Sequence, residues 1–315
     1  MSQTYEAAKI SITSCMGVKP GERFLILTDV EQLDLAKEFL KAGNDLGIET
    51  VMVCGPVHHS GEMPEISKAA LSQADVCMMI TTGSFTHTTG RAEATKRGCR
   101  IASMPGITEE IVQNTLGANY NEIERIGTLL ADKLTKAKKI HITTEAGTDL
   151  TLSCDGRQGI ADTGKLTKKG AFGNLPAGEA MVAPIETKGN GILVVDGVIA
   201  DFKVMETPLT ITFENGRIIK TEGPDAKAFD EFLDQFQDTA KHVCEFGIGT
   251  NPTCKIIGNG LVDEKVFGTI HVACGNNLFM GGQQDCDMHY DMIIYAPTVW
   301  LDDTCIIKKG KHIYL

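Results

Sequence analysis

Short apolar runs alternate with stretches of helical apolar spacing along the first third of the chain. The runs predict strands, and the stretches between them, such as the one with Leu35, Phe39 and Leu40, predict helices. In chain order the predicted strands and helices cover residues 23–28, 33–46, 49–54, 66–71, 74–80, 88–97 and 100–104. Strands joined by helices of this length form right-handed crossovers, which produce a parallel sheet. We therefore predict a Rossmann-like α/β domain over residues 1–107.

No glycine-rich turn follows the first of these strands. Thr28, Asp29 and Val30 lead directly into the next predicted helix, whereas a dinucleotide-binding fingerprint has closely spaced glycines at this position. No nucleotide cofactor is therefore expected, despite the Rossmann-like alternation.

The next stretch has a helical pattern without strand-like alternation. Thr108 is the expected N-cap of its first helix, with Glu109 and Glu110 in the first turn. We predict that residues 108–138 form helices that bridge two domains.

The pattern changes from residue 139 onward, where alternating apolar and polar positions favour short strands. Asn215-Gly216 lies between two such runs, and this dipeptide is typical of a tight β-hairpin. The predicted strands cover residues 139–143, 149–153, 192–196, 209–213 and 217–220, and the predicted helix covers 226–240. An α+β domain rich in antiparallel strands is therefore predicted for residues 139–315.

Charge and hydropathy limit the partners of the chain. A net charge of −11 and a pI near 5.2 argue against a nucleic-acid-binding surface. No apolar run reaches the ~18–20 residues that span a bilayer, so no membrane association is expected.

The N-terminus and the cysteines indicate the compartment. The first residues lack the basic start and the apolar core of a signal peptide. The ten cysteines form no CxxC pair, and several, such as Cys54, Cys77 and Cys274, lie in apolar runs, which is typical of reduced, buried thiols. A cytoplasmic location is therefore expected.

Acidic and imidazole side chains gather in three segments of the second predicted domain, each beside glycine. Glu179 follows a glycine, Glu245 begins Glu-Phe-Gly-Ile-Gly, and His271 lies in Gly-Thr-Ile-His-Val-Ala-Cys-Gly. His289 and Asp291 are two positions apart in a strand-like run, so their side chains point to the same side. Such convergence is typical of metal ligands. The alternative is that these are ordinary polar residues of turns and strand ends.

Together these segments resemble the aminopeptidase T, or leucyl aminopeptidase, family of metallopeptidases. The shared motifs N-L-P-x-G-E, E-x-G-x-G-T-N-P, G-x-x-H-x-A-x-G and H-x-D occur here in that order at residues 174–179, 245–252, 268–275 and 289–291. A weaker match over residues 104–109 extends the resemblance to the first domain.

The resemblance implies a site for two divalent metal ions with Glu179, Glu245, His271, His289 and Asp291 as ligands. Zinc, cobalt or manganese suits such nitrogen and oxygen ligands. Two ions that share carboxylates can activate water for attack on a carbonyl group. The implied function is an aminopeptidase-like metalloprotease, a hydrolase that acts on a peptide or a small amide. The resemblance also implies a homodimer.

One departure from the peptidase pattern concerns the transition state. Peptidases of the family have a tyrosine seven residues after the first histidine, where it stabilises the tetrahedral intermediate. The residue here is Leu278, which has no donor, and the segment 281–287 between the two histidines is short. A catalytically silent metal-binding homologue is therefore one alternative.

A second alternative follows from the same resemblance, because the 2,5-dihydroxypyridine dioxygenases share this fold. In those enzymes a single Fe(II) is held by two histidines and an aspartate, and a histidine of the first domain contacts the substrate. His87 follows a predicted strand of the parallel sheet and is the candidate for that contact; an exposed loop histidine is the alternative. His58 and His59 are expected in a solvated loop.

The retention of Glu179 and Glu245 favours the hydrolase, because a one-iron site does not require them. We therefore expect an amide hydrolase with Glu179 and His87 as candidate catalytic residues. The Fe(II) dioxygenase that opens an N-heteroaromatic ring is the alternative function.

Overall fold

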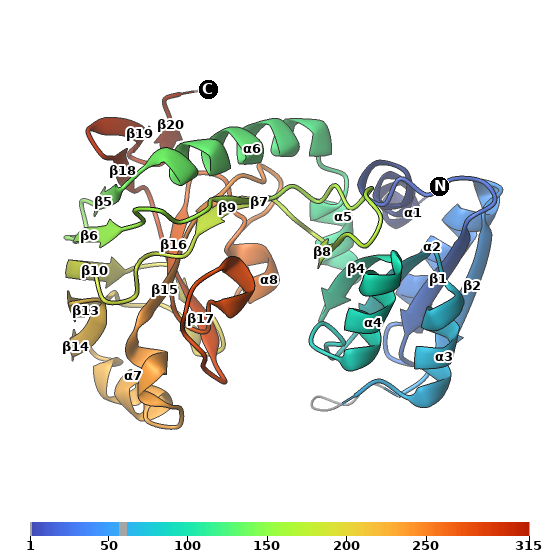
Figure 1. The fold of residues 1–315 in the computed structure, drawn as a ribbon, viewed down its shortest axis with the longest axis horizontal. Helices are drawn as coiled ribbons and strands as arrows, with labels where there is room; N and C mark the ends of the chain where they lie inside the picture. The colour runs from blue at the N-terminus through green and yellow to red at the C-terminus, as the bar shows by residue number, and fades with distance from the viewer. Residues whose placement is uncertain (1, 57–61, 315) are drawn as a thin grey trace. The chain divides into compact units, whose positions relative to one another are not determined.

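The computed structural model describes residues 2–56 and 62–314 (Figure 1). His58 and His59, predicted as loop residues, lie outside the described residues. Two compact units are formed by Met1–Asn121 with Gly164–Ala177 and by Glu122–Thr163 with Gly178–Leu315.

The first unit contains a five-stranded sheet in which all neighbouring strands run parallel, in the order β2-β1-β3-β4-β8. Every residue of the central strand β3 is buried, as expected for a parallel sheet covered on both faces. The predicted parallel sheet is confirmed. Its strands are β1 (Arg23–Thr28), β2 (Glu49–Cys54), β3 (Val76–Thr81), β4 (Arg100–Pro105) and β8 (Phe172–Asn174).

Helices precede and connect these strands. The N-terminal helix begins after Ser2, whose Oγ accepts a hydrogen bond from the Tyr5 amide at 3.1 Å. The helical elements are α1 (Gln3–Ile10), the π-helical η1 (Ser11–Cys15), α2 (Leu33–Asp45), α3 (Glu65–Gln73), α4 (Thr89–Arg97) and α5 (Glu109–Thr115).

Strand β8 reaches the first sheet from a later part of the chain. Phe172 pairs with Ile101 of β4 in parallel, and residues 164–177 belong to the first unit. The domain boundaries predicted from the sequence place residues 139–315 in one continuous domain. A three-residue strand is too short for its alternation to be recognised in sequence, so this return of the chain was not predicted.

The predicted helical stretch is interrupted between α5 and α6 (Tyr120–Lys136). The predicted cap of α5 is confirmed, because Thr108 Oγ1 accepts a hydrogen bond from the Ile111 amide at 3.2 Å. The interruption falls at Gly117, whose low helix propensity favours a break, and Asn119 Oδ1 accepts from the Asn121 amide at 3.2 Å where α6 begins.

The second unit contains two sheets. One has eight strands in the order β14-β13-β10-β6-β5-β18-β19-β20, and the other has seven in the order β12-β11-β17-β16-β15-β9-β7. The strands of the first of these are β5 (Lys139–Thr143), β6 (Asp149–Ser153), β10 (Gly189–Val195), β13 (Leu209–Glu214), β14 (Arg217–Glu222), β18 (Thr298–Leu301), β19 (Thr304–Lys308) and β20 (Lys311–His312). Those of the second are β7 (Ile160–Asp162), β9 (Glu179–Val182), β11 (Val198–Ile199), β12 (Lys203–Val204), β15 (Val243–Gly249), β16 (Ile270–Gly275) and β17 (His289–Ile294).

Two local predictions for this unit had different outcomes. The hairpin at Asn215-Gly216 is confirmed, since both residues have positive φ (51° and 77°) and connect antiparallel β13 and β14. The single helix predicted over 226–240 is wrong. The chain forms α7 (Ala226–Leu233) and then a 3-10 turn, η2 (Asp238–Lys241), separated by a stretch that begins with Asp234, a weak helix former.

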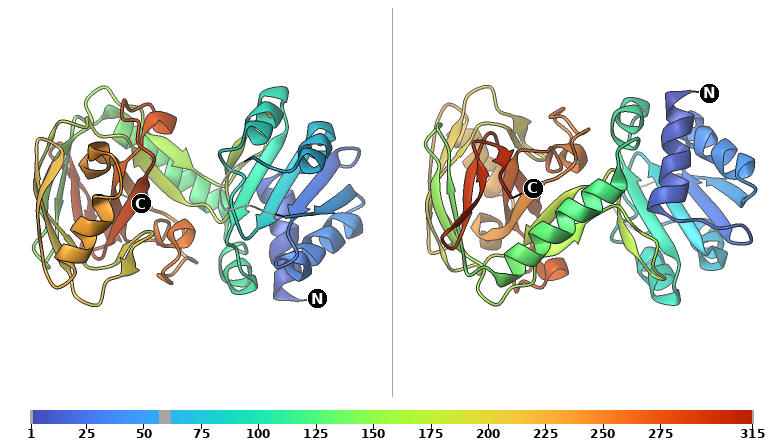
Figure 2. Two further views of the ribbon diagram at one scale, coloured as in Figure 1. Left: turned by 90° about the horizontal axis from the view of Figure 1, so that it is seen from below. Right: turned by 90° about the horizontal axis from the view of Figure 1, so that it is seen from above.

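One apolar core joins the two sheets and two helices of this unit. It includes Leu150 and Leu193 from the eight-stranded sheet, Phe246 from the seven-stranded sheet, Leu130 from α6 and Phe229 from α7, all at most 1% exposed. Figure 2 shows α6 beside the strands of the second unit. The fold is thus an α/β unit with a parallel sheet and an α+β unit rich in antiparallel strands, as predicted.

None of the helices within the described residues has the length and apolar character needed to cross a bilayer.

Candidate metal centre

Four neighbouring strands of the seven-stranded sheet place acidic and imidazole side chains on one face. Glu179 begins β9, Glu245 lies on β15, His271 on β16, and His289 and Asp291 on β17. These are the five residues that the sequence resemblance proposed as metal ligands, and the structure brings them together.

Strand register explains why the side chains share a face. Gly249 pairs with Glu179 and Gly247 with His271, while Ala273 of β16 pairs with both Glu245 and Asp291. Directly paired residues point to the same side of a sheet, as do residues two apart along a strand. The alternate residues, including Phe246, Val272 and Met292, point into the apolar core. Cys274 lies on that core side as well, so its predicted packing role is confirmed.

Glycine at position 247 makes room for the first imidazole. A Cβ atom there would lie 1.9 Å from His271 Nε2, far inside contact distance. Gly249 has a similar role, because a Cβ atom there would lie 2.1 Å from the carbonyl oxygen of Val266. The glycines of the Glu-x-Gly-x-Gly motif therefore admit a neighbouring side chain and a neighbouring backbone to the face of the sheet.

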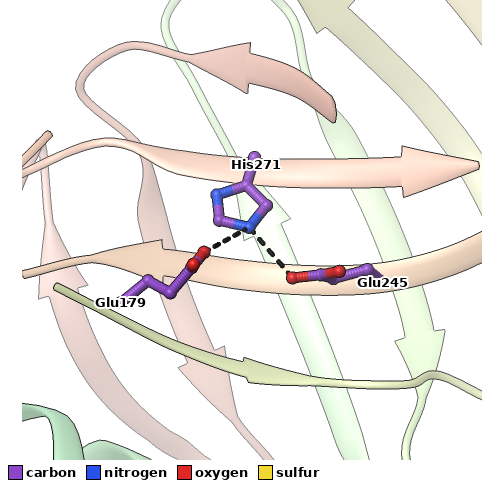
Figure 3. A group of neighbouring side chains, drawn as sticks. All are labelled: Glu179, Glu245 and His271. Atoms are coloured by element: carbon purple, nitrogen blue, oxygen red, sulfur yellow. Dashed lines mark hydrogen bonds and ion pairs between the residues drawn. The ribbon is translucent and has the colours of Figure 1, made fainter. Parts of the chain in front are cut away.

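His271 lies between two carboxylates at the buried side of the centre (Figure 3). Its Nε2 atom is 3.2 Å from Glu245 Oε1 and 3.3 Å from Glu179 Oε2. The Oδ1 atom of Asp291 is 4.0 Å from the same nitrogen. All four side chains are less than 10% exposed, so water cannot replace these contacts.

His289 contacts two of these carboxylates, Glu245 and Asp291, and is more exposed than His271. Its Nε2 atom is 3.3 Å from Glu245 Oε2 and 3.6 Å from Asp291 Oδ1, and its side chain is 25% exposed. The Nδ1 atom is 2.8 Å from the carbonyl oxygen of Asn276. Because a carbonyl can only accept, Nδ1–H donates, and Nε2 is the ring nitrogen that faces Glu245 and Asp291.

A hydrogen-bonded network holds the loop that provides this carbonyl. Glu186 Oε1 accepts from Asn277 Nδ2 at 2.9 Å and from the Gln283 amide at 2.8 Å. Arg157 Nη2 donates to Glu186 Oε2 at 2.6 Å. Glu186 and Arg157 are both largely buried, so the network supports the position of His289 through the loop backbone.

The donor set fits a divalent cation. Ligand atoms converge within 4.8 Å of one another in two groups, Glu179–Glu245–His271 and Glu245–His289–Asp291, which share Glu245. The buried Oδ1 atom of Asp291 has no hydrogen-bond donor, although a buried carboxylate oxygen requires a partner. Carboxylate and imidazole ligands suit a divalent transition metal.

Carboxylates dominate the electrostatics of the candidate centre. Burial lowers the pKa of His271, but Glu245, Asp291 and Glu179 outweigh burial and raise it to about 10. Burial raises the pKa of Glu245, but hydrogen bonds with His271 and His289 outweigh burial and lower it below its usual value. The centre therefore keeps ionised carboxylates that attract a cation.

Two residues of the centre were not predicted. Lys265 Nζ lies 3.2 Å from Glu179 Oε1, and the lysine side chain is only 1% exposed. Glu264 contacts the same ammonium group. In sequence both belong to a charged run after the short helix α8 (Gly260–Asp263), a pattern typical of a solvated turn, so nothing distinguished them.

The remaining candidates do not belong to either group of converging ligand atoms. His87 is exposed in the turn after β3 and belongs to the first unit. Leu278 is 50% exposed on the 3-10 turn η3 (Leu278–Met280). Its neighbour Phe279 packs edge-on against His289, with ring centroids 5.5 Å apart. Cys54, predicted as a buried thiol, is exposed on the edge strand β2.

Comparisons with known proteins give one family. The family model described as 2,5-dihydroxypyridine 5,6-dioxygenase matches residues 4–314. The 2,5-dihydroxypyridine 5,6-dioxygenase of Pseudomonas putida strain KT2440 is 23% identical over 280 residues, which cover 84% of this chain and 78% of the relative.

Two solved structures share the fold. The 2,5-dihydroxypyridine dioxygenase of Pseudomonas putida KT2440 superposes with a TM-score of 0.86 at 17% identity, covering 100% of this chain and 99% of the other. AmpT from Thermus thermophilus superposes with a TM-score of 0.74 at 15% identity, covering 99% of each chain. At these identities the likeness concerns the fold.

These matches correct the expected activity. The predicted aminopeptidase-like hydrolase, with its protease class, is wrong, because the family model and the curated relative are both dioxygenases. The resemblance to aminopeptidase T was a resemblance of fold. The presence of Glu179 and Glu245 was the reason to expect a hydrolase, and the structure shows other partners for both carboxylates. Glu179 pairs with Lys265, and Glu245 pairs with both imidazoles. Neither carboxylate therefore requires a second metal ion or a hydrolytic reaction.

Proposed function

The chain belongs to the 2,5-dihydroxypyridine 5,6-dioxygenase family, and from that membership we propose that it is a non-haem Fe(II) dioxygenase that opens a dihydroxylated pyridine ring. The match over residues 4–314, which includes both units, is the observation on which the proposal rests. A dihydroxypyridine, or a closely related hydroxylated N-heteroaromatic compound, is the proposed substrate class.

The ligand types of the centre support iron. His271, His289 and Asp291 provide two imidazoles and one carboxylate, the set that non-haem Fe(II) oxygenases use. Asp291 Oδ1 lies 4.0 Å and 3.6 Å from the Nε2 atoms of the two histidines and has no hydrogen-bond partner. We assign these three residues as the iron ligands, with Glu245 between the two imidazoles as a further carboxylate.

Iron(II), when bound, would supply the redox chemistry that allows dioxygen to react with an electron-rich ring. The protein has to hold its imidazoles in the neutral, metal-binding form. The Asn276 carbonyl accepts the Nδ1 hydrogen bond of His289 and so fixes the ring with Nε2 toward the other ligands. His289 is also the more exposed imidazole, at 25%, so substrate is expected to approach from its side.

His87 is proposed as a substrate contact or acid–base residue. It follows β3 of the parallel sheet, and such sheets bind ligands beyond the carboxyl ends of their strands. Its side chain is exposed. A His87→Gln variant that raises KM for the dihydroxypyridine while its iron content stays unchanged would support this role, and an unchanged KM and kcat would remove it.

Metal content and oxygen uptake test the proposed function together. Protein purified without added metal and loaded with Fe(II) under argon is expected to consume oxygen and 2,5-dihydroxypyridine in equal amounts. Hydrolysis of amides by zinc-, cobalt- or manganese-loaded protein, with no oxygen uptake by the iron form, would contradict the proposal.

Matched histidine variants locate the activity. His289→Ala is expected to lose iron and oxygen uptake. His141→Ala is the control, because His141 stacks on Trp300 in the other sheet of the same unit, with ring centroids 5.1 Å apart, and should retain both. The predicted homodimer and cytoplasmic location stay predictions, and light scattering measures the first directly.

A further inference from the structure

A buried ammonium group lies beside the metal ligands. Lys265 is fully buried, and its Nζ atom is 3.2 Å from Glu179 Oε1 while Glu264 contacts it as well. Asp162 lies directly opposite Glu179 in the pairing of β7 and β9. A buried ammonium group requires such carboxylate partners. Lys265 is therefore an integral part of the candidate metal centre.

Gly249 determines where the backbone around Lys265 can lie. It is on β15, the strand on which Gly247 makes room for His271. Gly249 pairs with Glu179, and a Cβ atom at 249 would lie 2.1 Å from the Val266 carbonyl oxygen and 2.8 Å from the Lys265 carbonyl carbon. The Lys265 carbonyl also accepts from the Asn251 amide at 2.9 Å. Glycine at 249 therefore lets the backbone that carries Lys265 lie directly over Glu179.

The ammonium group of Lys265 pairs with a member of only one of the two groups of candidate ligands. Glu179 is a member of the Glu179–Glu245–His271 group, whereas the Glu245–His289–Asp291 group does not include it. A divalent ion bound to Glu179 would lie next to the positive charge of Lys265, and the two cations would repel each other in a buried environment. The second group has no ion pair with a lysine or arginine among the described residues.

We propose that the ammonium group of Lys265 neutralises Glu179 in place of a second metal ion. The centre is thereby restricted to one divalent ion, which binds to the ligands assigned above and not to Glu179. Lys265 is a positioning residue in this arrangement, because it acts through Glu179. The proposal deepens the proposed function, on which it rests for the use of a single metal ion.

Metal stoichiometry tests the proposal without substrate or oxygen. Wild-type protein stripped of metal and titrated with Co(II) in a calorimeter is expected to bind one ion per chain, and elemental analysis after dialysis should agree. Lys265→Met removes the ammonium group and is expected to double the stoichiometry. Lys265→Arg keeps the charge and should bind one ion. Lys203→Met is the matched control, since Lys203 pairs with Asp225 at 3.0 Å outside the centre, and should also bind one.

A variant of the partner carboxylate keeps the test decisive if Lys265→Met does not fold. Glu179→Gln is expected to bind one ion with an affinity that falls less than about tenfold, the smallest loss typical of a disturbed metal site. A larger loss would make Glu179 a ligand and overturn the proposal. The double variant Lys265→Met/Glu179→Gln should return to one ion.

The outcomes separate this proposal from the proposed function. Two ions in the wild-type chain, or one in Lys265→Met, would overturn the role of Lys265 whatever the activity. One ion in the wild-type chain and two in Lys265→Met, together with no oxygen uptake by the iron form, would leave the role of Lys265 intact and remove the dioxygenase proposal.

Discussion

The two faces of the seven-stranded sheet differ in what their residues do. On β15, β16 and β17 the core face has Phe246, Val272 and Met292, none of them exposed, in the apolar core. The other face has the carboxylates and imidazoles of the metal centre. Neighbouring residues of one strand thus belong separately to the apolar core and to the candidate metal centre, because successive side chains point to opposite faces. Substitutions at adjacent positions of one strand should therefore separate the two properties.

The largest expected effect is on the core face. Phe246→Ala removes a fully buried ring and should lower the free energy of unfolding by about 3–5 kcal/mol. The metal stoichiometry of the folded fraction should stay unchanged, because the side chain points away from the centre. Urea unfolding followed by circular dichroism measures the first quantity and elemental analysis the second. Loss of metal at full stability would show that the two faces are not separate.

Removal of a bound metal ion should lower the stability of the folded chain through the face of the sheet that has the carboxylates and imidazoles. A ligand present at 100 times its dissociation constant stabilises the folded state by about 2.7 kcal/mol. Chelation should therefore lower the melting temperature of wild-type protein, and Phe246→Ala should show the same decrease from its lower starting value. A melting temperature that does not respond to chelation would contradict metal binding by the folded chain.

Gly247→Ala tests the room made for His271. A Cβ atom at this position would lie 1.9 Å from His271 Nε2, so the imidazole must move, and metal affinity should fall by about 10–100-fold. Calorimetric titration measures the affinity. Gly117→Ala is the control, because a Cβ atom there meets nothing within 4 Å, and it should leave the affinity unchanged.

The smallest expected effect is in the network behind His289. Glu186→Gln weakens the contact with Arg157 and the acceptor for Asn277, so the loop should hold His289 less firmly and metal affinity should fall by roughly tenfold. Glu206→Gln replaces an exposed carboxylate of the same unit and should have no effect. An equal response of both variants would assign the change to net charge.

Local patterns predicted most of the fold. The bounds of β1, β2, β5 and β6 agree with the apolar runs, because a strand with one or two buried faces has an apolar pattern of its own. The short strand β8 was missed, because its place in the first sheet depends on pairing with β4, a contact distant in sequence.

The sequence named the residues of the candidate centre, and for the activity it gave the wrong main expectation with the dioxygenase as the alternative. Motifs shared across the fold include Glu179, Glu245 and the two histidines, and the structure brings them together. Lys265 could not be found, because only tertiary packing over Gly249 distinguishes it from a surface lysine. Without Lys265, the presence of Glu179 favoured the hydrolase, which the family match contradicts.

The hydrogen bond from His289 to Asn276 has a consequence for mutational tolerance. Its acceptor is a main-chain carbonyl, which every amino acid provides, so a substitution at position 276 does not remove the acceptor itself. Only a changed path of the loop, through an insertion, a deletion or a lost anchor, would release the imidazole. In a random mutant library, length variants between β16 and β17 should therefore be inactive far more often than point variants at position 276.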